Sequence, residues 1–381
     1  MNIKYIAFYD IDEYEFENRV NPLSARNVSD YIVKKLISEG HNVEIVSPSE
    51  TKLRKGYYKS RSNLYDGVRV TLGPTWGTQN KYLRSFFSLL TRAWFLVYLL
   101  VNVKSSDVII LWHQIPAMEL IMLFRLITHK RNEFILCVGE IYQKVIPNMI
   151  SERRKKRELK FISSADKYIL STLGIKKYVN IENRPIVELP GMLNTLANRK
   201  RIFNDSRIHI LYSGVINSTK GAFEAVDMMD YLDDRYVLHI LGWGQDIDSI
   251  DRLIDHINSK HDHKKIVYEG IKRGGEYEDY LLSCDIGLCS QDQNVAYNDC
   301  SFPSKILTYL CANIKVICTN IPAVKESAVA DMIYFVDSNS PFELAEAVRK
   351  VSFLPAPDTR IKMGELDDVI ERELNSLIVK R

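Results

Sequence analysis

This chain of 381 residues lacks a strong excess of either charge. It has 51 Lys and Arg against 48 Asp and Glu, which gives a net charge of +3. Such a balance provides no overall field for nucleic acid, so we expect no nucleic-acid partner. The sequence also lacks a C-x-x-C pair, and its 6 cysteines are scattered, most of them inside apolar runs. Buried thiols of a cytosolic protein are therefore expected, in preference to disulfides or a metal site.

The N-terminus lacks the basic n-region and the long apolar h-region of a secretory signal peptide. We therefore predict a cytoplasmic protein. Three common signatures are missing as well: the nucleophile elbow, the Walker loop and the dinucleotide-binding fingerprint. Their absence argues against an α/β-hydrolase, a P-loop NTPase and a nicotinamide-dependent dehydrogenase.

One apolar run, residues 85–103, is long enough to cross a membrane, but Arg92 lies near its middle and polar residues interrupt it. The simpler interpretation is a buried helix in front of a buried strand, and contact with a membrane surface is the alternative. The basic run 153–157 is a second surface signal, since each Lys or Arg attracts anionic lipid by about 1 kcal/mol. A solvated helix face paired with neighbouring glutamates is the competing interpretation of that run.

Strand and helix patterns alternate along the chain. In the first half, buried strands are predicted at residues 3–9, 43–46, 68–72, 107–112, 134–138 and 167–170. Residues 186–205 show no periodicity and are predicted to form a linker. Beyond it the alternation restarts, with strands predicted at residues 208–212, 237–241, 265–268, 285–289 and 316–318. Near-continuous apolar strands separated by helices are typical of parallel sheets covered on both faces.

The predicted fold class is therefore α/β, with two Rossmann-like, doubly wound parallel-sheet domains facing a cleft. The expected domains are residues 1–190 and 200–358, and a last helix at 360–381 is expected to pack back on the first. Ligands of such sheets bind beyond the carboxyl ends of the strands, so the cleft is the predicted site.

The segment IHILYSGVINSTKGAFEAVDMM carries the clearest chemical signal. A buried strand ends at Gly214, a short polar loop follows, and Lys220 opens an amphipathic helix. Small residues let backbone amides approach a ligand, a helix N-terminus favours an anion, and Lys220 adds a positive charge. The combination suits a diphosphate, although taken alone it also fits an ordinary strand-to-helix turn.

Later segments strengthen the diphosphate interpretation. VLHILGWGQDIDSI gives a strand and then the turn Gly242-x-Gly244, and VYEGIKRGGEYEDYLLSCDIGLCSQ gives a strand, a glycine, a helix and another strand. SFPSKILTYLCANIKVICTNIPAVKE places Ser304, Lys305 and Thr308 at the start of a helix that leads into a buried strand.

In this order and spacing, the four segments resemble the nucleotide-sugar-binding half of GT-B glycosyltransferases, family 4 in particular. The resemblance covers residues 208–336, and the first half is similar mainly in its order of strands and helices. It implies a metal-independent hexosyltransferase with no resident cofactor and with a nucleotide-sugar donor, a UDP-sugar, as co-substrate. It also implies a glycan or lipid-linked saccharide as acceptor, in bacterial cell-surface polysaccharide synthesis at the inner face of the membrane.

Carried over position by position, the resemblance assigns Lys220 and Gly214 to the donor diphosphate. Val215 stands where the family often has an arginine, and Lys305 is the expected substitute for that charge. The backbone of Ile271 takes the place of the segment that borders the base.

The Glu-x7-Glu pair of the family is missing. When the second glutamate is aligned on Thr308, Cys300 stands at the first position, with Asp299 beside it. A threonine hydroxyl still suits a ribose hydroxyl, but the loss motivates an alternative, a non-catalytic glycosyltransferase-like subunit that binds a glycan or a partner enzyme. A nucleotide-sugar 2-epimerase is the second alternative.

The acceptor side rests on fewer residues. Glu140 follows strand 134–138 and is expected to act as a base toward the acceptor hydroxyl or to steady the donor sugar. Capping of the next helix is the alternative for Glu140. His113 ends strand 107–112 and is a candidate catalytic residue, with a structural histidine hydrogen-bonded to backbone as its alternative. The polar and aromatic loop 10–23 is predicted to recognise the acceptor.

Overall fold

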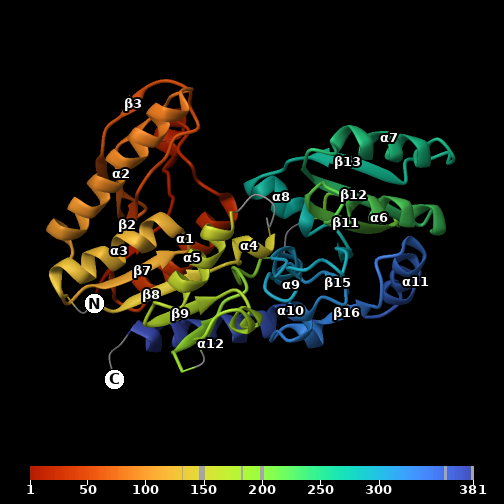
Figure 1. The fold of residues 1–381 in the computed structure, drawn as a ribbon. Coiled ribbons are helices and arrows are strands. Elements are labelled where there is room, and N and C mark those ends of the chain that lie inside the picture. The colour runs from red at the N-terminus through yellow and green to blue at the C-terminus, as the bar shows by residue number, and fades with distance from the viewer. Residues whose placement is uncertain (131, 146–150, 182, 198–200, 356–357, 379–381) are drawn as a thin grey trace. The chain divides into compact units, whose positions relative to one another are not determined.

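The computed structural model of the protein describes residues 1–130, 132–145, 151–181, 183–197, 201–355 and 358–378 (Figure 1). The chain forms two compact units, Met1–Leu189 together with Val369–Arg381, and Pro190–Asp368. Each unit is built on its own sheet of largely parallel strands.

The first unit contains an eight-stranded sheet in the order β10-β9-β8-β7-β1-β2-β5-β4. In chain order its strands are β1 (Asn2–Ile6), β2 (Asn42–Ser47), β4 (Arg61–Tyr65), β5 (Val68–Leu72), β7 (Val108–Trp112), β8 (Phe134–Val138), β9 (Lys167–Leu170) and β10 (Ile186–Glu188). A separate antiparallel pair is formed by β3 (Tyr57–Tyr58) and β6 (Thr75–Trp76). The sheet is not purely parallel as predicted, because β4 is antiparallel to β5. β4 is the last strand at one edge of the sheet, and an antiparallel edge strand on an otherwise parallel sheet is common.

Helices cover both faces of the first sheet. In chain order they are α1 (Leu23–Ser38), α2 (Lys81–Asn102), α3 (Ile115–Thr128), α4 (Tyr142–Val145), α5 (Glu152–Ile162) and α12 (Thr359–Ile378). Right-handed crossovers from β5 to β7, β8 and β9 place α2, α3 and α5 on one face, and α3 packs against the other two. α1 connects strands in the opposite direction and covers the other face. The end of α12 lies beside α1, with Lys35 Nζ 2.7 Å from Glu371 Oε2.

The second unit contains a six-stranded parallel sheet in the order β13-β12-β11-β14-β15-β16. Its strands are β11 (Ile208–Val215), β12 (Tyr236–Trp243), β13 (Ile266–Gly270), β14 (Ile286–Cys289), β15 (Lys315–Thr319) and β16 (Ile333–Val336). Its helices are α6 (Ala222–Asp227), α7 (Ile247–Asn258), α8 (Gly274–Leu281), α9 (Lys305–Cys311), α10 (Pro322–Lys325) and α11 (Pro341–Ser352). The strand order reverses between β11 and β14, which is where ligands of such sheets bind.

Two expectations from the sequence are wrong in detail. The predicted linker 186–205 contains β10, and the division between the units follows Leu189. The run 85–103 is not a buried helix, because α2 buries only Thr91, Phe95, Tyr98 and Leu99. The cysteines are unpaired and buried, as expected.

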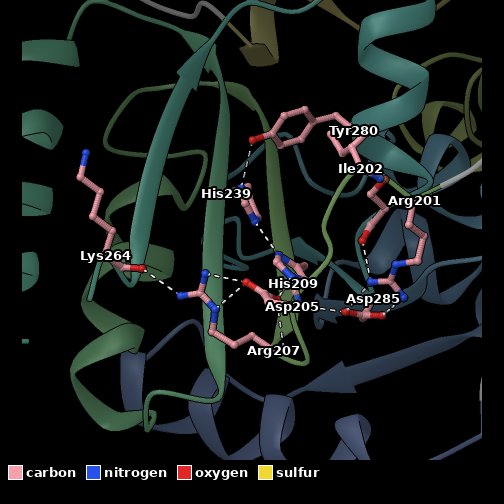
Figure 2. Close-up of polar contacts among 10 residues, drawn as sticks. Arg201, Ile202, Asp205, Arg207, His209, His239, Lys264, Tyr280 and Asp285 are labelled. Carbon is pink, nitrogen blue, oxygen red and sulfur yellow. Dashed lines mark hydrogen bonds and ion pairs between the residues drawn. The ribbon is translucent and has the colours of Figure 1, made fainter. Parts of the chain in front are cut away.

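Polar contacts hold the segment that enters β11 at the amino-terminal edge of the second sheet (Figure 2). Asp205 Oδ1 lies 2.8 Å from His209 Nε2, and His209 Nδ1 lies 2.9 Å from His239 Nε2. The Phe203 ring stacks on both imidazoles, with centroids 4.1 Å and 4.5 Å away. Burial lowers the pKa of His239 to about 3, so its ring is neutral. In the hydrogen bond between the two histidines, one ring nitrogen therefore donates and the other accepts.

Candidate functional site

β11 and β12 end side by side at the carboxyl edge of the second sheet, and the penultimate residue of each is a glycine. Gly214 pairs in register with Gly242, and their φ angles are 153° and 140°. A Cβ on Gly242 would lie 1.8 Å from the carbonyl oxygen of Gly214, and one on Gly244 would lie 1.8 Å from that of Ile216. These glycines are required because two backbones approach each other too closely for any side chain.

Lys305, the first residue of α9, extends over Gly214. A Cβ on Gly214 would lie 3.2 Å from Lys305 Nζ, so a side chain at this position would displace the amine. The amine is buried and has no hydrogen-bond partner among the described residues. It lies 3.7 Å from the centroid of the Tyr212 ring. Burial lowers the pKa of Lys305 to about 8, and the nearby charge of Lys220 lowers it as well.

Lys220 approaches the same edge from the loop between β11 and α6. The Asn217 side chain accepts hydrogen bonds from the backbone amides of Thr219, at 3.1 Å, and Lys220, at 3.0 Å, and so fixes the loop as an Asx turn. Lys220 Nζ lies 3.3 Å from Gln291 Oε1 and 4.6 Å from the centroid of the Tyr297 ring. The loop therefore directs a second cation toward the ends of β11 and β14.

Among the described residues, no carboxylate is a resolved influence on the Lys305 amine. The charged groups that act on the Lys305 amine are Lys220 and the thiols of Cys289 and Cys318. Neighbouring cations repel each other, and this repulsion disappears when an anion lies between them. The arrangement is suited to a ligand with at least two negative charges.

Ser304 and Thr308 lie on either side of Lys305 at the start of α9, and both are accessible to solvent. Ser304 is exposed, and the Thr308 hydroxyl donates to the Ser304 carbonyl oxygen at 3.4 Å, which leaves its own oxygen free to accept. Ile271 is 55% exposed and directly follows β13, whose end pairs with β12. The structure therefore places these predicted donor residues at one edge of the second sheet, together with the two lysines.

Cys300, aligned with the first glutamate of the missing pair, is 0% exposed. It is part of the protein interior and has no access to a substrate. The sequence interpretation also missed Gln291, the partner of Lys220, and Tyr277 of α8, whose hydroxyl lies 3.1 Å from Ser213 Oγ. Gln291 was detectable, because polar residues just after a parallel strand lie at the ligand-binding edge.

In the first unit, the structure brings His113 and Glu140 together through the backbone. His113 Nδ1 lies 3.3 Å from the carbonyl oxygen of Glu140, and its ring stacks on Tyr142 with centroids 4.8 Å apart. Burial lowers the pKa of His113 to about 4, so the neutral ring donates through Nδ1. His113 is 1% exposed. Its geometry fits the alternative role, that of a structural histidine hydrogen-bonded to backbone.

Glu158, not Glu140, caps the helix that follows β8. Glu158 Oε1 accepts from the amide of Tyr142 at 2.7 Å, and Oε2 accepts from the amide of Gln143 at 3.1 Å. Glu140 is half-buried at the carboxyl end of β8. Its carboxylate is therefore not needed as the cap of α4.

Metal independence stays a prediction. Within the described ranges, one group of carboxylates comes close enough to share a cation: Asp367, Asp368 and Glu371 on α12. Glu371 is already paired with Lys35. None of the three is among the predicted site residues.

Residues 195–365 match the sequence model of a family described as glycosyl transferases group 1. No curated protein matches the chain by sequence. Solved structures are similar over nearly its whole length. A trehalose-6-phosphate structure from E. coli bound with UDP-2-fluoro glucose has a TM-score of 0.69 at 10% identity, covering 99% of this chain and 97% of that one.

Two further structures agree. A UDP-forming trehalose-phosphate synthase from Burkholderia xenovorans has a TM-score of 0.67 at 10% identity and covers 99% of this chain and 96% of its own. Anabaena Alr3699/HepE in complex with UDP has a TM-score of 0.65 at 10% identity and covers 99% of both chains. At such low identity the likeness shows the fold alone, and it confirms the predicted GT-B fold.

Proposed function

We propose that this chain, a nucleotide-sugar glycosyltransferase of the GT-B fold, moves a hexose from a UDP-sugar to a hydroxyl of a glycan or lipid-linked saccharide. The observation that carries the proposal is the buried amine of Lys305, which has no hydrogen-bond partner among the described residues and lies near a second cation, Lys220. A nucleoside diphosphate supplies the negative charge that this pair requires. UDP is the favoured donor nucleotide because structures with the same fold hold UDP or a UDP-sugar analogue.

Each donor residue is assigned to one part of the nucleotide sugar. Lys220 and Lys305 bind the diphosphate, and the close approach of Gly214 and Gly242 keeps the floor of the site free of side chains. The Thr308 hydroxyl accepts a hydrogen bond from the ribose, where the family has a glutamate. The exposed backbone at Ile271 borders the base.

In the proposed reaction, the acceptor oxygen forms a bond to the anomeric carbon, and the bond from that carbon to the diphosphate oxygen breaks. Negative charge develops on the departing diphosphate, and the two lysines stabilise it. The acceptor hydroxyl loses a proton, and Glu140 is the proposed base. His113 holds the Glu140 backbone, so we assign it a positioning role.

The proposed setting is cell-surface polysaccharide synthesis at the cytoplasmic side of the membrane. The chain needs no resident cofactor or metal in this proposal, because two ammonium groups supply positive charge at the leaving diphosphate.

Calorimetry with UDP, GDP and dTDP and their sugars tests the donor assignment. We expect UDP to bind, and we expect Lys220→Ala and Lys305→Met each to weaken binding by roughly 10- to 100-fold, the value of one charge-assisted hydrogen bond. Lys350→Ala is the matched control, since Lys350 is an exposed lysine of the same unit on α11.

The same experiment separates the alternatives. If no nucleotide binds, the donor proposal is wrong and a non-catalytic subunit is favoured. Sugar interconversion without an acceptor favours a 2-epimerase, whereas UDP release that requires an acceptor supports transfer.

A further inference from the structure

α2 presents large apolar side chains that the first unit does not cover. On its outer side, Phe86 is 53% exposed, Leu89 60%, Val97 56% and Val101 75%. Within the described part of the chain, α2 is the helix that is long and apolar enough to cross a membrane, and 22% of its most apolar window is buried. Single exposed apolar residues are ordinary, but a continuous stripe along a helix marks an interaction surface.

The apolar surface continues onto the neighbouring helix. α3 packs against α2, and its last turns expose Leu126 at 70% and Ile127 at 53%. We call the exposed apolar side chains of α2 and α3, together with the exposed basic residues of α5, the docking face. All three helices cover the same face of the first sheet (Figure 1).

The charge of the docking face is positive. α2 carries three basic residues and no acidic one. On α5, Arg153, Arg154 and Lys156 are exposed. These three belong to the run singled out in the sequence, and α5 packs against α3, the helix that also packs against α2.

The acidic residues of these helices are already engaged. Glu119 pairs with Arg157, and Glu152 Oε1 lies 2.6 Å from Lys155 Nζ. Glu158 is 0% exposed and caps α4. The charge of Glu152 also acts on Lys156, but in the described part of the chain no carboxylate of the three helices pairs with Arg153 or Arg154. The docking face therefore keeps an excess of positive charge and complements a surface of negative charge.

This charge distribution decides between occupants. In a symmetric dimer the same patch would meet itself, and the basic residues of the two copies would face each other without acidic partners. A membrane span is disfavoured by packing, because Phe95 and Leu99 of α2 are each 0% exposed and anchor the helix to the first unit. An anionic lipid surface satisfies both the apolar stripe and the cations.

We propose that the docking face rests on an anionic membrane leaflet, with α2 lying in the plane of the surface. The apolar side chains enter the boundary between headgroups and acyl chains, and the basic residues of α5 contact the headgroups. This inference extends the proposed function, because a lipid-linked acceptor is presented at such a surface. The membrane proposal is tested without donor or acceptor. Its failure therefore does not decide the proposed function, and failure of the proposed function does not decide the membrane proposal.

The test is flotation of the purified full chain with vesicles of phosphatidylcholine, alone or with 30% phosphatidylglycerol (roughly the charge density of an anionic leaflet). We expect binding only to the anionic vesicles. We expect R153A/R154A/K156A to bind about 100-fold more weakly, since each lost charge costs a factor of about 5 near such a surface. L89Q/V101Q should weaken binding by about 10-fold at 0.5 M NaCl, where the apolar contribution dominates.

Matched controls lie on α1, on the opposite face of the sheet. Leu23 is 70% exposed and Lys34 is also exposed, so L23Q and K34A should leave vesicle binding unchanged. All substituted positions are exposed, and circular dichroism checks that the variants fold.

Three results would overturn the proposal. One is absence of binding to anionic vesicles, and a second is binding that the docking-face variants do not change. The third is a dimer, detected by sedimentation, that L89Q/V101Q dissociates, because it would assign the face to a second copy of the chain.

Discussion

The Lys305 amine lies 3.7 Å from the centroid of the Tyr212 ring, and the described residues offer it no hydrogen-bond acceptor. The π-face stabilises the ammonium form without neutralising it. A buried cation held in this way has its full charge available for a ligand. In the proposed function, this amine supplies the positive charge that an arginine at the position of Val215 often supplies in the family that the chain resembles.

UDP affinity should depend on pH through Lys305. Its pKa is lowered to about 8, so the amine is charged at pH 7 and mostly neutral at pH 9. Because only the charged form attracts a diphosphate, the dissociation constant should rise about 10-fold between pH 7 and pH 9. Calorimetry across this range measures it.

Lys305→Arg provides the control for this pH dependence. Arginine stays charged over the whole range, so its profile should be much flatter than that of the unchanged protein, whatever its absolute affinity. An equally flat profile for the unchanged protein would show that Lys305 does not bind the diphosphate.

Gly242→Ala should destabilise the second unit severely. A Cβ at this position would lie 1.8 Å from the Gly214 carbonyl oxygen, a contact that only backbone movement relieves. We expect a loss of about 3 kcal/mol or more in the free energy of unfolding, measured in urea. At Gly364 of α12, a Cβ meets nothing within 4 Å, so Gly364→Ala should instead stabilise the chain by about 0.5–1 kcal/mol. Equal effects of the two substitutions would contradict this account.

The strands were largely predictable because buried parallel strands are continuous apolar runs. β5, β8 and β9 have the bounds predicted from the sequence. β10 was missed because three residues are too few to show a pattern. β4 was missed because its burial alternates between half-buried and exposed, and its sequence RSNLY is mostly polar. The exposure of α2 was also hidden, since an apolar window does not show which side of a helix packs.

The candidate site was only partly readable from the sequence. Gly214 and Lys220 belong to one strand-loop-helix segment, so local pattern was enough to select them. The position of Lys305 over Gly214 instead depends on the reversal of strand order between β11 and β14, which no local pattern shows. For Glu140, proximity in the sequence suggested helix capping as the alternative to a catalytic role, and Glu158 of α5 instead forms that cap through tertiary contact.

His113 should make the first unit sensitive to acid. Its pKa is about 4 in the folded protein, lowered by burial, against about 6.5 when unfolded. Below pH 6.5 the unfolded chain takes up a proton that the folded chain does not, so stability falls as the pH falls toward 4. Between pH 7 and pH 5 the expected loss is about 2 kcal/mol.

His113→Phe should remove this part of the acid sensitivity while keeping the stacking on Tyr142. The measurement is the change in unfolding free energy between pH 7 and pH 5, compared between the variant and the unchanged protein. Other titrating groups are the same in both proteins, so their effects cancel in this comparison. If the variant loses as much stability as the unchanged protein, His113 is not the group responsible.

Glu140→Gln and Glu158→Gln should separate catalysis from stability. Both are glutamates near the end of β8, but Glu158 is buried and accepts two backbone hydrogen bonds, whereas Glu140 is half-buried. Glu140→Gln should lower kcat by roughly 100- to 10,000-fold, the range for loss of a general base, and leave UDP affinity unchanged. Glu158→Gln should lower the unfolding free energy by about 1–3 kcal/mol and keep kcat within a few fold. Steady-state transfer rates and urea unfolding of both variants distinguish the roles. Full activity in Glu140→Gln would exclude Glu140 as the base and would favour a carboxylate of the loop 10–23 in that role.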